Sequence, residues 1–451
     1  MTNIIYIPVE YFRREFIAKA TLAIYLSIQG ATVVIGHKWY VRRTAMLNGK
    51  SGDVYIHNHA NSINDAEDLQ SLKDRNFILI GYEDEGALDY VDYKKQLYLR
   101  NQQNGFEKFD MWLCWGKNEY AVLRQLHDNS TKFKCIGTPR SAVWGEVGKN
   151  IWAKEITKVV EPKYRNYVLI ATSFHSKSHL SFATSIGRLN RIYRGNSIDQ
   201  VLEQSAKEAL MEEQMINQMH VLINDLLKET KFNIVLRPYF TRDSEIENQL
   251  QLINPERIFI EQNLDITPLI IAARAVLHMG STVAIESIIN DKKTIFIRPF
   301  LENQSSVLHK DYEHLVSSAI SIPLAPNSKC STLLDLDTEP SVQVSNFVIS
   351  NSEINFYSEF SNHLKALNHT IFDKKSYIKL KKAPFHQLII YRTFTFLKRS
   401  NLYKYDRLKR PALRTKFFKM LVQKVSPFFG MYHSEFKVQK IERSTYVLTR
   451  T

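Results

Sequence analysis

The sequence predicts an α/β protein built from two parallel-sheet domains and a basic helical tail. Short apolar segments alternate with helix-like segments from Ile4 to about residue 140, and this pattern begins again at Tyr167. The 451 residues suffice for two or three domains with cores of their own. We expect domains at residues 1–150 and 163–373, joined by a connector over 140–163, and a tail at 374–451.

In the first half, helices are expected over residues 13–29 and 117–126, where apolar positions recur at helical spacing. Strands are expected at residues 4–9, 32–35, 53–57, 77–81, 111–115 and 134–136. No Gly-x-Gly-x-x-Gly motif opens the first helix, so this half carries no dinucleotide signature.

In the second half, a long helical segment is expected over residues 199–228. Strands are expected at residues 167–172, 232–237, 257–260, 275–277 and 294–297. Two such α/β halves imply a cleft between them, where the ligands of parallel sheets bind.

The tail holds most of the net charge of +14. From Lys374 onward there are 20 Lys and Arg residues against three acidic residues, whereas the preceding 373 residues hold 40 basic and 43 acidic groups. Pro411 is placed to start a helix with Leu413, Phe417, Met420, Leu421 and Val425 on one face; a second basic amphipathic segment spans 384–398. This pattern favours contact with an anionic membrane surface, and the alternatives are a helix packed on the body or a nucleic-acid patch.

Composition excludes several classes of protein. No apolar run approaches the ~18 residues of a membrane span, and no signal peptide is expected. Cys114, Cys135 and Cys330 are scattered, which favours a reducing cytoplasm. The pairs His57/His59 and His175/His179 lack a third ligand, so no metal and no cofactor are expected.

The segment from Val276 to Ile289 is the most informative stretch of the chain. A short apolar strand leads into Gly280, Ser281 and Thr282, and helical spacing follows with Glu286 in the second turn. Backbone N–H groups at a helix start, together with two hydroxyls, suit a phosphate, and Glu286 is placed to reach a ribose hydroxyl. An ordinary capped helix would show the same pattern.

An acidic group directly follows the fourth strand. Glu83, Asp84 and Glu85 precede Gly86 at the carboxyl end of that strand, the edge where parallel sheets bind ligands. Neighbouring carboxylates repel, which raises the pKa of one of them and suits a general base. A solvated acidic turn is the alternative.

Two further polar residues end strands of the second half. Arg237, before Pro238, is placed to clamp a phosphate, or else to form a structural ion pair. His278 lies beside the Gly-Ser-Thr turn and is a candidate donor to a phosphate or a base, although a structural histidine would also fit there.

Several short motifs follow one another along the chain in the order found in a known family. They are Arg14-Glu15-Phe-Ile-Ala-Lys-Ala, Asp84-Glu85-Gly86, Trp115-Gly116-Lys117, Gly137-Thr-Pro-Arg140, Leu236-Arg-Pro238 and His278-Met-Gly-Ser-Thr282. The chain resembles the bacterial surface carbohydrate biosynthesis proteins, which have the two-Rossmann GT-B architecture, and it is similar to the sialyltransferases and Kdo transferases that use CMP-sugars. The resemblance covers roughly residues 1–330.

The resemblance implies roles for individual residues. Asp84 or Glu85 would be the acidic catalytic residue, acting as a base in an inverting transfer or as a nucleophile in a retaining one. Ser281 and Thr282 would bind the CMP phosphate, Glu286 the ribose. The chain departs from the family's Arg-Pro-His-Pro motif, because Tyr239 and Phe240 follow Arg237 and Pro238. A Tyr hydroxyl donates a hydrogen bond but lacks an imidazole's charge.

The expected function is therefore a cytoplasmic GT-B glycosyltransferase of surface polysaccharide synthesis. It would transfer Kdo or a nonulosonate from a CMP donor to a glycan or lipid-linked acceptor, and its tail would hold it on the inner face of the membrane. The alternatives are a CDP-polyol phosphotransferase, a non-catalytic scaffold of glycan assembly and, least favoured, a nucleic-acid-binding protein.

Overall fold

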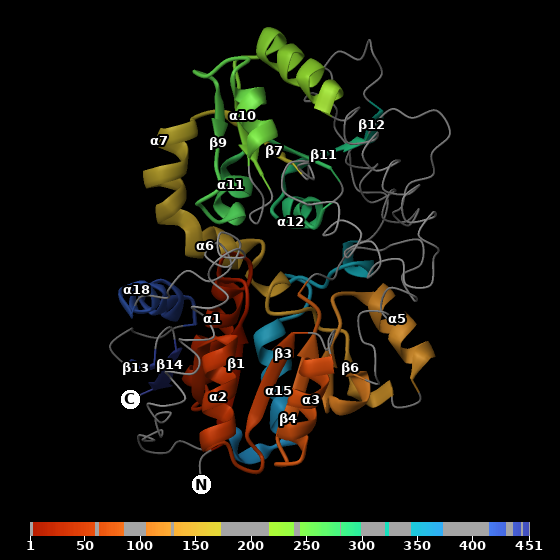
Figure 1. The fold of residues 1–451 in the computed structure, drawn as a ribbon, viewed down its shortest axis with the longest axis vertical. Helices are drawn as coiled ribbons and strands as arrows, with labels where there is room; N and C mark the ends of the chain where they lie inside the picture. Colours follow the sequence, from red (N-terminus) through yellow and green to blue (C-terminus); the bar gives the residue numbers. More distant parts are fainter. Residues whose placement is uncertain are drawn as a thin grey trace. The chain divides into compact units, whose positions relative to one another are not determined.

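The structure of the chain is a computed structural model (Figure 1). It describes residues 3–58, 63–84, 105–127, 130–172, 216–238, 244–279, 281–298, 321–323, 344–372, 415–429, 436–442 and 445–450. The elements named below belong to these residues.

The chain forms two compact units, each built on its own sheet. One unit comprises Met1–Ile151 with Val344–Thr451, and the other comprises Trp152–Gln343. The first sheet has eight strands and the second has six. The prediction of two Rossmann-like α/β halves with parallel sheets is confirmed.

The sheet of the first unit has the order β13-β14-β2-β1-β3-β4-β5-β6. Its six parallel strands are β1 (Ile4–Val9), β2 (Thr32–His37), β3 (Val54–Asn58), β4 (Ile78–Tyr82), β5 (Met111–Leu113) and β6 (Phe133–Lys134). The direction of strand progression reverses between β1 and β3, and this point of a parallel sheet opens a crevice beyond the carboxyl ends of its strands.

Helices cover this sheet, and their apolar faces supply its core. They are α1 (Phe12–Ile28), α2 (Lys38–Asn48), α3 (Ile63–Lys73), α5 (Lys117–Leu126), α15 (Phe356–Leu367) and α18 (Thr415–Val425). On one face, Tyr6, Leu79 and Trp112 pack against Val41 of α2 and Leu72 of α3. Apolar burial of this kind is the main stabilising term of such a domain.

The expected connector between the halves is helical. α6 (Glu146–Glu155) continues through a π-helical turn at Ile156–Val160 into α7 (Glu161–Tyr164), and the boundary between the units falls inside α6. Ile151, Val160 and Tyr164 are buried, so this segment is packed along its length and is not a free linker.

The sheet of the second unit has the order β12-β11-β10-β7-β8-β9, all parallel. The strands are β7 (Tyr167–Ala171), β8 (Asn233–Arg237), β9 (Ile258–Ile260), β10 (Ala275–His278), β11 (Lys293–Arg298) and β12 (Ser321–Pro323). The helices are residues 216–229, α10 (Glu245–Gln251), α11 (Ile266–Ala272) and α12 (Val283–Ile289). Strand progression reverses between β7 and β10, as in dinucleotide-binding sheets.

The described part of the tail belongs to the first unit. β13 (Phe436–Glu442) and β14 (Thr445–Arg450) form an antiparallel hairpin, and β14 pairs antiparallel with β2. α18 lies beside α1 with Phe418 against Phe16, ring centroids 5.8 Å apart (Figure 1). The tail thus differs from the separate segment expected from its charge, because its apolar residues complete the core around α1 and β2.

The buried face of α18 also differs from the expected one. Phe418, Leu421, Val422 and Val425 are buried, whereas Met420 is 39% exposed. The alternative of a helix packed on the body therefore describes α18, while the segment 384–398 lies outside the described residues. None of the described helices combines the length and hydropathy that a membrane crossing requires.

The second unit ends earlier in the sequence than expected, at Gln343 and not at residue 373. After the second unit, the chain returns to the first unit, where residues 346–349 pass close to Gly116 and Gly137. Ile349 N–H donates to the carbonyl of Trp115 over 2.6 Å. A Cβ atom on Gly116 would lie 2.4 Å from the carbonyl carbon of Phe347, and one on Gly137 would lie 2.4 Å from the carbonyl oxygen of Ile349. These long-range contacts leave no local signal in the sequence.

Gly137→Ala is expected to destabilise the first unit by roughly 2–4 kcal/mol, since it combines a backbone clash with a left-handed conformation at φ +81°. Thermal unfolding measures the effect. Gly52→Ala is the control, because Gly52 has φ +84° but a Cβ atom there would meet only side chains, at 3.1 Å or more. Equal losses in both variants would show that the close passage over Gly137 contributes nothing.

Candidate functional site

A buried cluster of charges lies at the carboxyl ends of β1, β3 and β4. The ammonium group of Lys19 in α1 is its centre and is 1% exposed. It donates to Glu15 Oε2 over 2.6 Å, to Asn58 Oδ1 over 2.7 Å and to the Pro8 carbonyl over 2.9 Å. Asp84 Oδ2 lies 3.3 Å from the same nitrogen. One cation therefore holds two buried carboxylates at the sheet edge.

Glu15 organises the entry into α1. It stands four residues before Lys19, which places both side chains on one face of the helix. Its carboxylate accepts the backbone N–H groups of Glu10 (2.9 Å) and Tyr11 (3.1 Å) and the amide of Asn58 (3.1 Å). The two backbone N–H groups lie at the start of the helix and lack helical partners, so Glu15 fixes the turn that follows β1.

The two carboxyls of the cluster have opposite pKa shifts. Burial raises the pKa of Asp84 to about 6; the negative charge of Glu15 also raises it, and Lys19 lowers it only in part. Burial acts in the same direction on Glu15, but Lys19, Arg14 and the backbone N–H of Glu10 lower the pKa of Glu15 to about 2. Of the two carboxyls, Glu15 is therefore the one that Lys19 holds ionised more strongly, and Asp84 is the one that takes up a proton more readily.

The backbone around Asp84 is held from β5 and from the loop after β6. The indole of Trp115 donates to the carbonyl of Glu83 over 2.5 Å, and Arg140 donates to the carbonyl of Asp84 over 3.2 Å. Glu83 and Asp84 are both 2% exposed, so this part of the acidic group is not a solvated turn. Glu85 and Gly86 lie outside the described residues.

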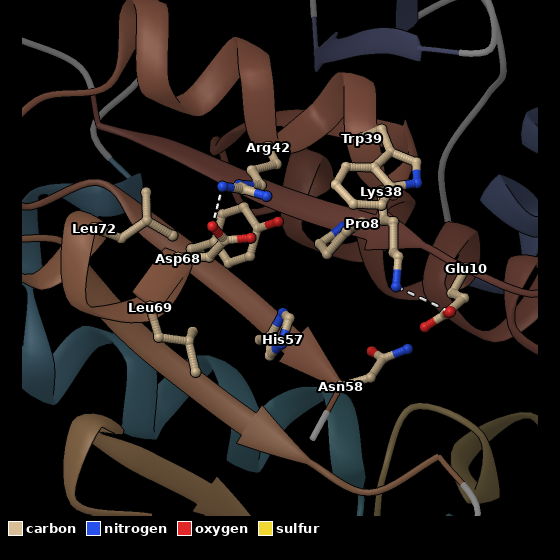
Figure 2. Close-up of a pocket in the computed structure, with 11 residues that line it drawn as sticks. Pro8, Glu10, Lys38, Trp39, Arg42, His57, Asn58, Asp68, Leu69 and Leu72 are labelled. Carbon is tan, nitrogen blue, oxygen red and sulfur yellow. Dashed lines mark ion pairs between the residues drawn. The ribbon is translucent and has the colours of Figure 1, made fainter. Parts of the chain in front are cut away.

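A pocket opens beside this cluster, at the reversal point between β1 and β3 (Figure 2). The pocket encloses about 510 Å³ of space, part of which is open to solvent. Its lining comprises Pro8, Glu10, Lys38, Trp39, Arg42, Tyr55, His57, Asn58, Asp68, Leu69 and Leu72. Asn58 belongs to both the pocket and the charge cluster.

In the second unit, three of the predicted nucleotide residues lie between the end of β10 and the start of α12. His278 ends β10, and Ser281 and Thr282 precede α12. Ser281 Oγ accepts the N–H of Val283 over 3.3 Å and so caps the helix start. Gly280 lies outside the described residues, as do Tyr239 and Phe240.

Two of the predicted residues lie in the interior of the unit. His278 is fully buried, which lowers its pKa to about 3, so the imidazole is neutral at pH 7. Glu286 is 1% exposed and accepts the hydroxyl of Thr267 over 2.5 Å, which ties α12 to α11. The role of Glu286 toward a ribose stays a prediction, and this hydrogen bond gives the residue a structural task in addition.

Arg237 shapes the loop after β9. Its guanidinium donates to the carbonyls of Glu261 (2.6 Å) and Leu264 (2.8 Å), and the residue is 6% exposed. Glu261 in turn accepts the N–H groups of Asn263 (2.5 Å) and Leu264 (3.0 Å). These two partners of Arg237 are backbone carbonyls, and its role toward a phosphate stays a prediction.

Glu15, Lys19 and Asn58 complete the cluster around Asp84, although no role was expected for them from the sequence. Glu15 and Lys19 stood in a recognised motif, and their spacing of four after a buried strand was the available signal. Asn58 at the end of β3 offered none. Among the described residues, no group of three or more His, Cys, Asp or Glu side chains could hold a metal ion.

Comparison with known proteins identifies the fold. No protein-family model matches the sequence, and no curated protein matches it either. Among solved structures, the UDP-GlcNAc 2-epimerase from Methanocaldococcus jannaschii matches with a TM-score of 0.51 at 11% identity, over 81% of this chain and 100% of that chain. An S. aureus MnaA–UDP structure matches with a TM-score of 0.50 at 14% identity, over 84% of this chain and 100% of that chain. At such identities the likeness establishes the GT-B-type fold alone.

Asp84→Asn is expected to raise the melting temperature at pH 7.5, by an amount corresponding to roughly 1–3 kcal/mol. A carboxyl with a raised pKa in the folded state costs stability above that pKa, and the cost fades as pH falls from about 6 toward the unfolded value near 3.8. The gain should therefore shrink by pH 4.5, whereas exposed Asp74→Asn should change little at either pH. A loss of stability at pH 7.5 would contradict the raised pKa of Asp84.

Proposed function

We propose that the chain is a nucleotide-sugar-dependent glycosyltransferase with Asp84 as its catalytic carboxylate. One observation carries this proposal: a buried carboxyl whose pKa is raised to about 6 lies at the carboxyl edge of a Rossmann-like sheet, 3.3 Å from a buried ammonium group. Such a carboxyl is ionised at neutral pH and still basic enough to accept a proton. The GT-B-type fold supports this assignment.

The proposed step is a substitution at the anomeric carbon of the donor. The acceptor oxygen forms a bond to that carbon, its proton passes to the Asp84 carboxylate, and the bond to the nucleotide phosphate breaks with its electron pair on the phosphate oxygen. Lys19 holds Asp84 in place, and Glu15 is the counterion of Lys19. In a retaining reaction Asp84 would instead attack the anomeric carbon itself.

The donor is proposed to bind the second unit at the reversal point of its sheet. Ser281 and Thr282 would contact the donor phosphate, with Gly280, His278, Arg237 and Glu286 around them. His278 would act as a neutral hydrogen-bond partner, since burial lowers its pKa to about 3. From the sequence resemblance, the proposed donor is a CMP-linked acidic sugar such as Kdo or a nonulosonate.

A second candidate is a sugar-nucleotide epimerase. The two structures with TM-scores of 0.50 and 0.51 are a UDP complex and an enzyme named UDP-GlcNAc 2-epimerase. Inversion at C2 also needs a group that removes a proton, and Asp84 would suit that task. The two candidates differ in one requirement: glycosyl transfer needs an acceptor, whereas epimerisation does not.

A donor panel distinguishes the remaining alternatives. CMP-, UDP- and CDP-linked donors are incubated with and without glycan acceptors, and products are separated by mass and by NMR. Conversion of a UDP-sugar alone identifies an epimerase, and transfer of a polyol phosphate from a CDP donor identifies the phosphotransferase. A chain that binds none of the donors would be the non-catalytic scaffold.

Membrane association is proposed to be electrostatic. Because the apolar side of α18 is buried, the contact with anionic lipids would be made by the basic side chains of residues 374–451. Sedimentation with anionic vesicles should fall with salt and fail with zwitterionic ones. Equally salt-dependent binding to RNA, without binding to vesicles, would favour the nucleic-acid alternative.

Asp84→Asn is expected to lower kcat/KM for transfer about 10²–10⁴-fold. In the wild type, activity should rise with pH through about 6, because only the ionised carboxylate accepts a proton. Asp74→Asn, on an exposed turn after α3, is the control and should keep the wild-type profile. Full activity of the Asp84→Asn protein would remove the catalytic assignment.

Ser281→Ala with Thr282→Ala is expected to weaken nucleotide binding about tenfold or more, through loss of two hydroxyl contacts to phosphate. Calorimetry with CMP, CDP and UDP measures the change. Ser244→Ala is the matched control in the same unit, because that side chain makes no capping hydrogen bond to α10. Unchanged affinity in the double variant would move the phosphate away from the start of α12.

A further inference from the structure

The pocket beside the charge cluster occupies the position where a parallel sheet binds ligands. Pro8 lies near the carboxyl end of β1, and His57 and Asn58 end β3. Strand progression reverses between these two strands, and a parallel sheet binds ligands at such a point. None of the residues assigned to catalysis or nucleotide binding from the sequence lines it.

The lining of the pocket combines an aromatic platform with two ion pairs. The Trp39 side chain on α2 is 39% exposed, one of the few large apolar side chains with such exposure in the described part of the chain. Lys38 and Arg42 lie 5.6 Å and 5.9 Å from its ring centroid. Figure 2 shows the ion pair of Lys38 with Glu10 on one side of His57 and that of Arg42 with Asp68 on the other.

This combination matches an uncharged sugar ring better than an anion. The formal charges of the two cations and the two acids cancel, so a phosphate or carboxylate gains no net attraction. A sugar hydroxyl both donates and accepts, and each ion pair offers a donor and an acceptor side by side. The C–H face of a pyranose is apolar and suits the face of an indole.

We infer that the pocket lined by Trp39, Arg42, Asp68, Lys38 and Glu10 binds a neutral sugar ring. We assign this sugar ring to the acceptor, and only that assignment rests on the proposed function. Binding itself needs neither the donor nor turnover, so it is measured separately from transfer.

A short path of one hydrogen bond and one ion pair joins the pocket to the proposed base. Asn58 lines the pocket and accepts from Lys19 over 2.7 Å, and Lys19 lies 3.3 Å from Asp84. Asn58 also donates to Glu15 over 3.1 Å, which fixes its amide between the pocket and the buried charges. A sugar in the pocket would thus lie one side chain away from the cation that holds Asp84.

Saturation-transfer NMR on the full chain tests the inference. The probes are the methyl glycosides of glucose, galactose, mannose and N-acetylglucosamine, with glucuronate and galacturonate as charged probes. We expect at least one neutral glycoside to bind, more tightly than either charged probe. Trp39→Ala and Arg42→Gln should each weaken this binding tenfold or more, and Trp39→Phe should restore part of it.

Arg124→Gln is the matched control for Arg42→Gln, because Arg124 lies on an exposed face 5.5 Å from the ring of Tyr120 but outside the pocket. Circular dichroism and melting temperature show that each variant is folded. The inference is overturned if no neutral glycoside binds, if the charged probes bind more tightly, or if binding survives Trp39→Ala and Arg42→Gln. Sugar binding without transfer from any donor would keep this inference and reject the proposed function.

Discussion

The buried Lys19 ammonium group is the interaction on which the first unit's site depends. It joins the end of β1, the end of β3 and the turn after β4 through Pro8, Asn58 and Asp84, with Glu15 as its counterion. A buried cation requires a counterion, here Glu15, because removal of such a counterion typically costs roughly 3–5 kcal/mol. The same arrangement leaves Asp84 with a pKa raised to about 6, so the contact that fixes the geometry also prepares a proton acceptor.

The two sheets share one topological feature that explains where polar residues collect. Each has a point where strand progression reverses, between β1 and β3 in one unit and between β7 and β10 in the other. The charge cluster and the Trp39 pocket lie at the first point, and His278 with Ser281 lies at the second. Strands that are apolar along their length end in polar residues there, because the carboxyl edge is the part of a parallel sheet that helices leave open.

Sequence patterns predicted the helices and strands whose formation depends on neighbouring residues. The strands from β1 to β11 follow from apolar runs, and the helices α1 and α5 follow from helical spacing with few changes at their ends. Asp84 was a candidate because it follows a strand, but its burial and its partners were not predictable, since Asn58 and Lys19 approach it from elements 26 and 65 residues away in the sequence. The assignment of Asp84 to catalysis stays a prediction, as do those of Glu85, Arg237, His278, Gly280, Ser281, Thr282 and Glu286.

The position of the tail shows why net charge alone does not predict how a segment packs. Net charge reports on solubility and on partners, whereas placement follows from the apolar residues between the charges. In the described part of the tail, the buried apolar residues include Phe418, Leu421, Val422, Tyr446 and Leu448. β14 supplies backbone partners to β2, which would otherwise be an open edge, and Ser27 of α1 donates to the carbonyl of Leu448 over 3.2 Å. The first unit therefore depends on residues that precede and follow the second unit in the sequence, and its edge is completed only when the end of the chain has docked.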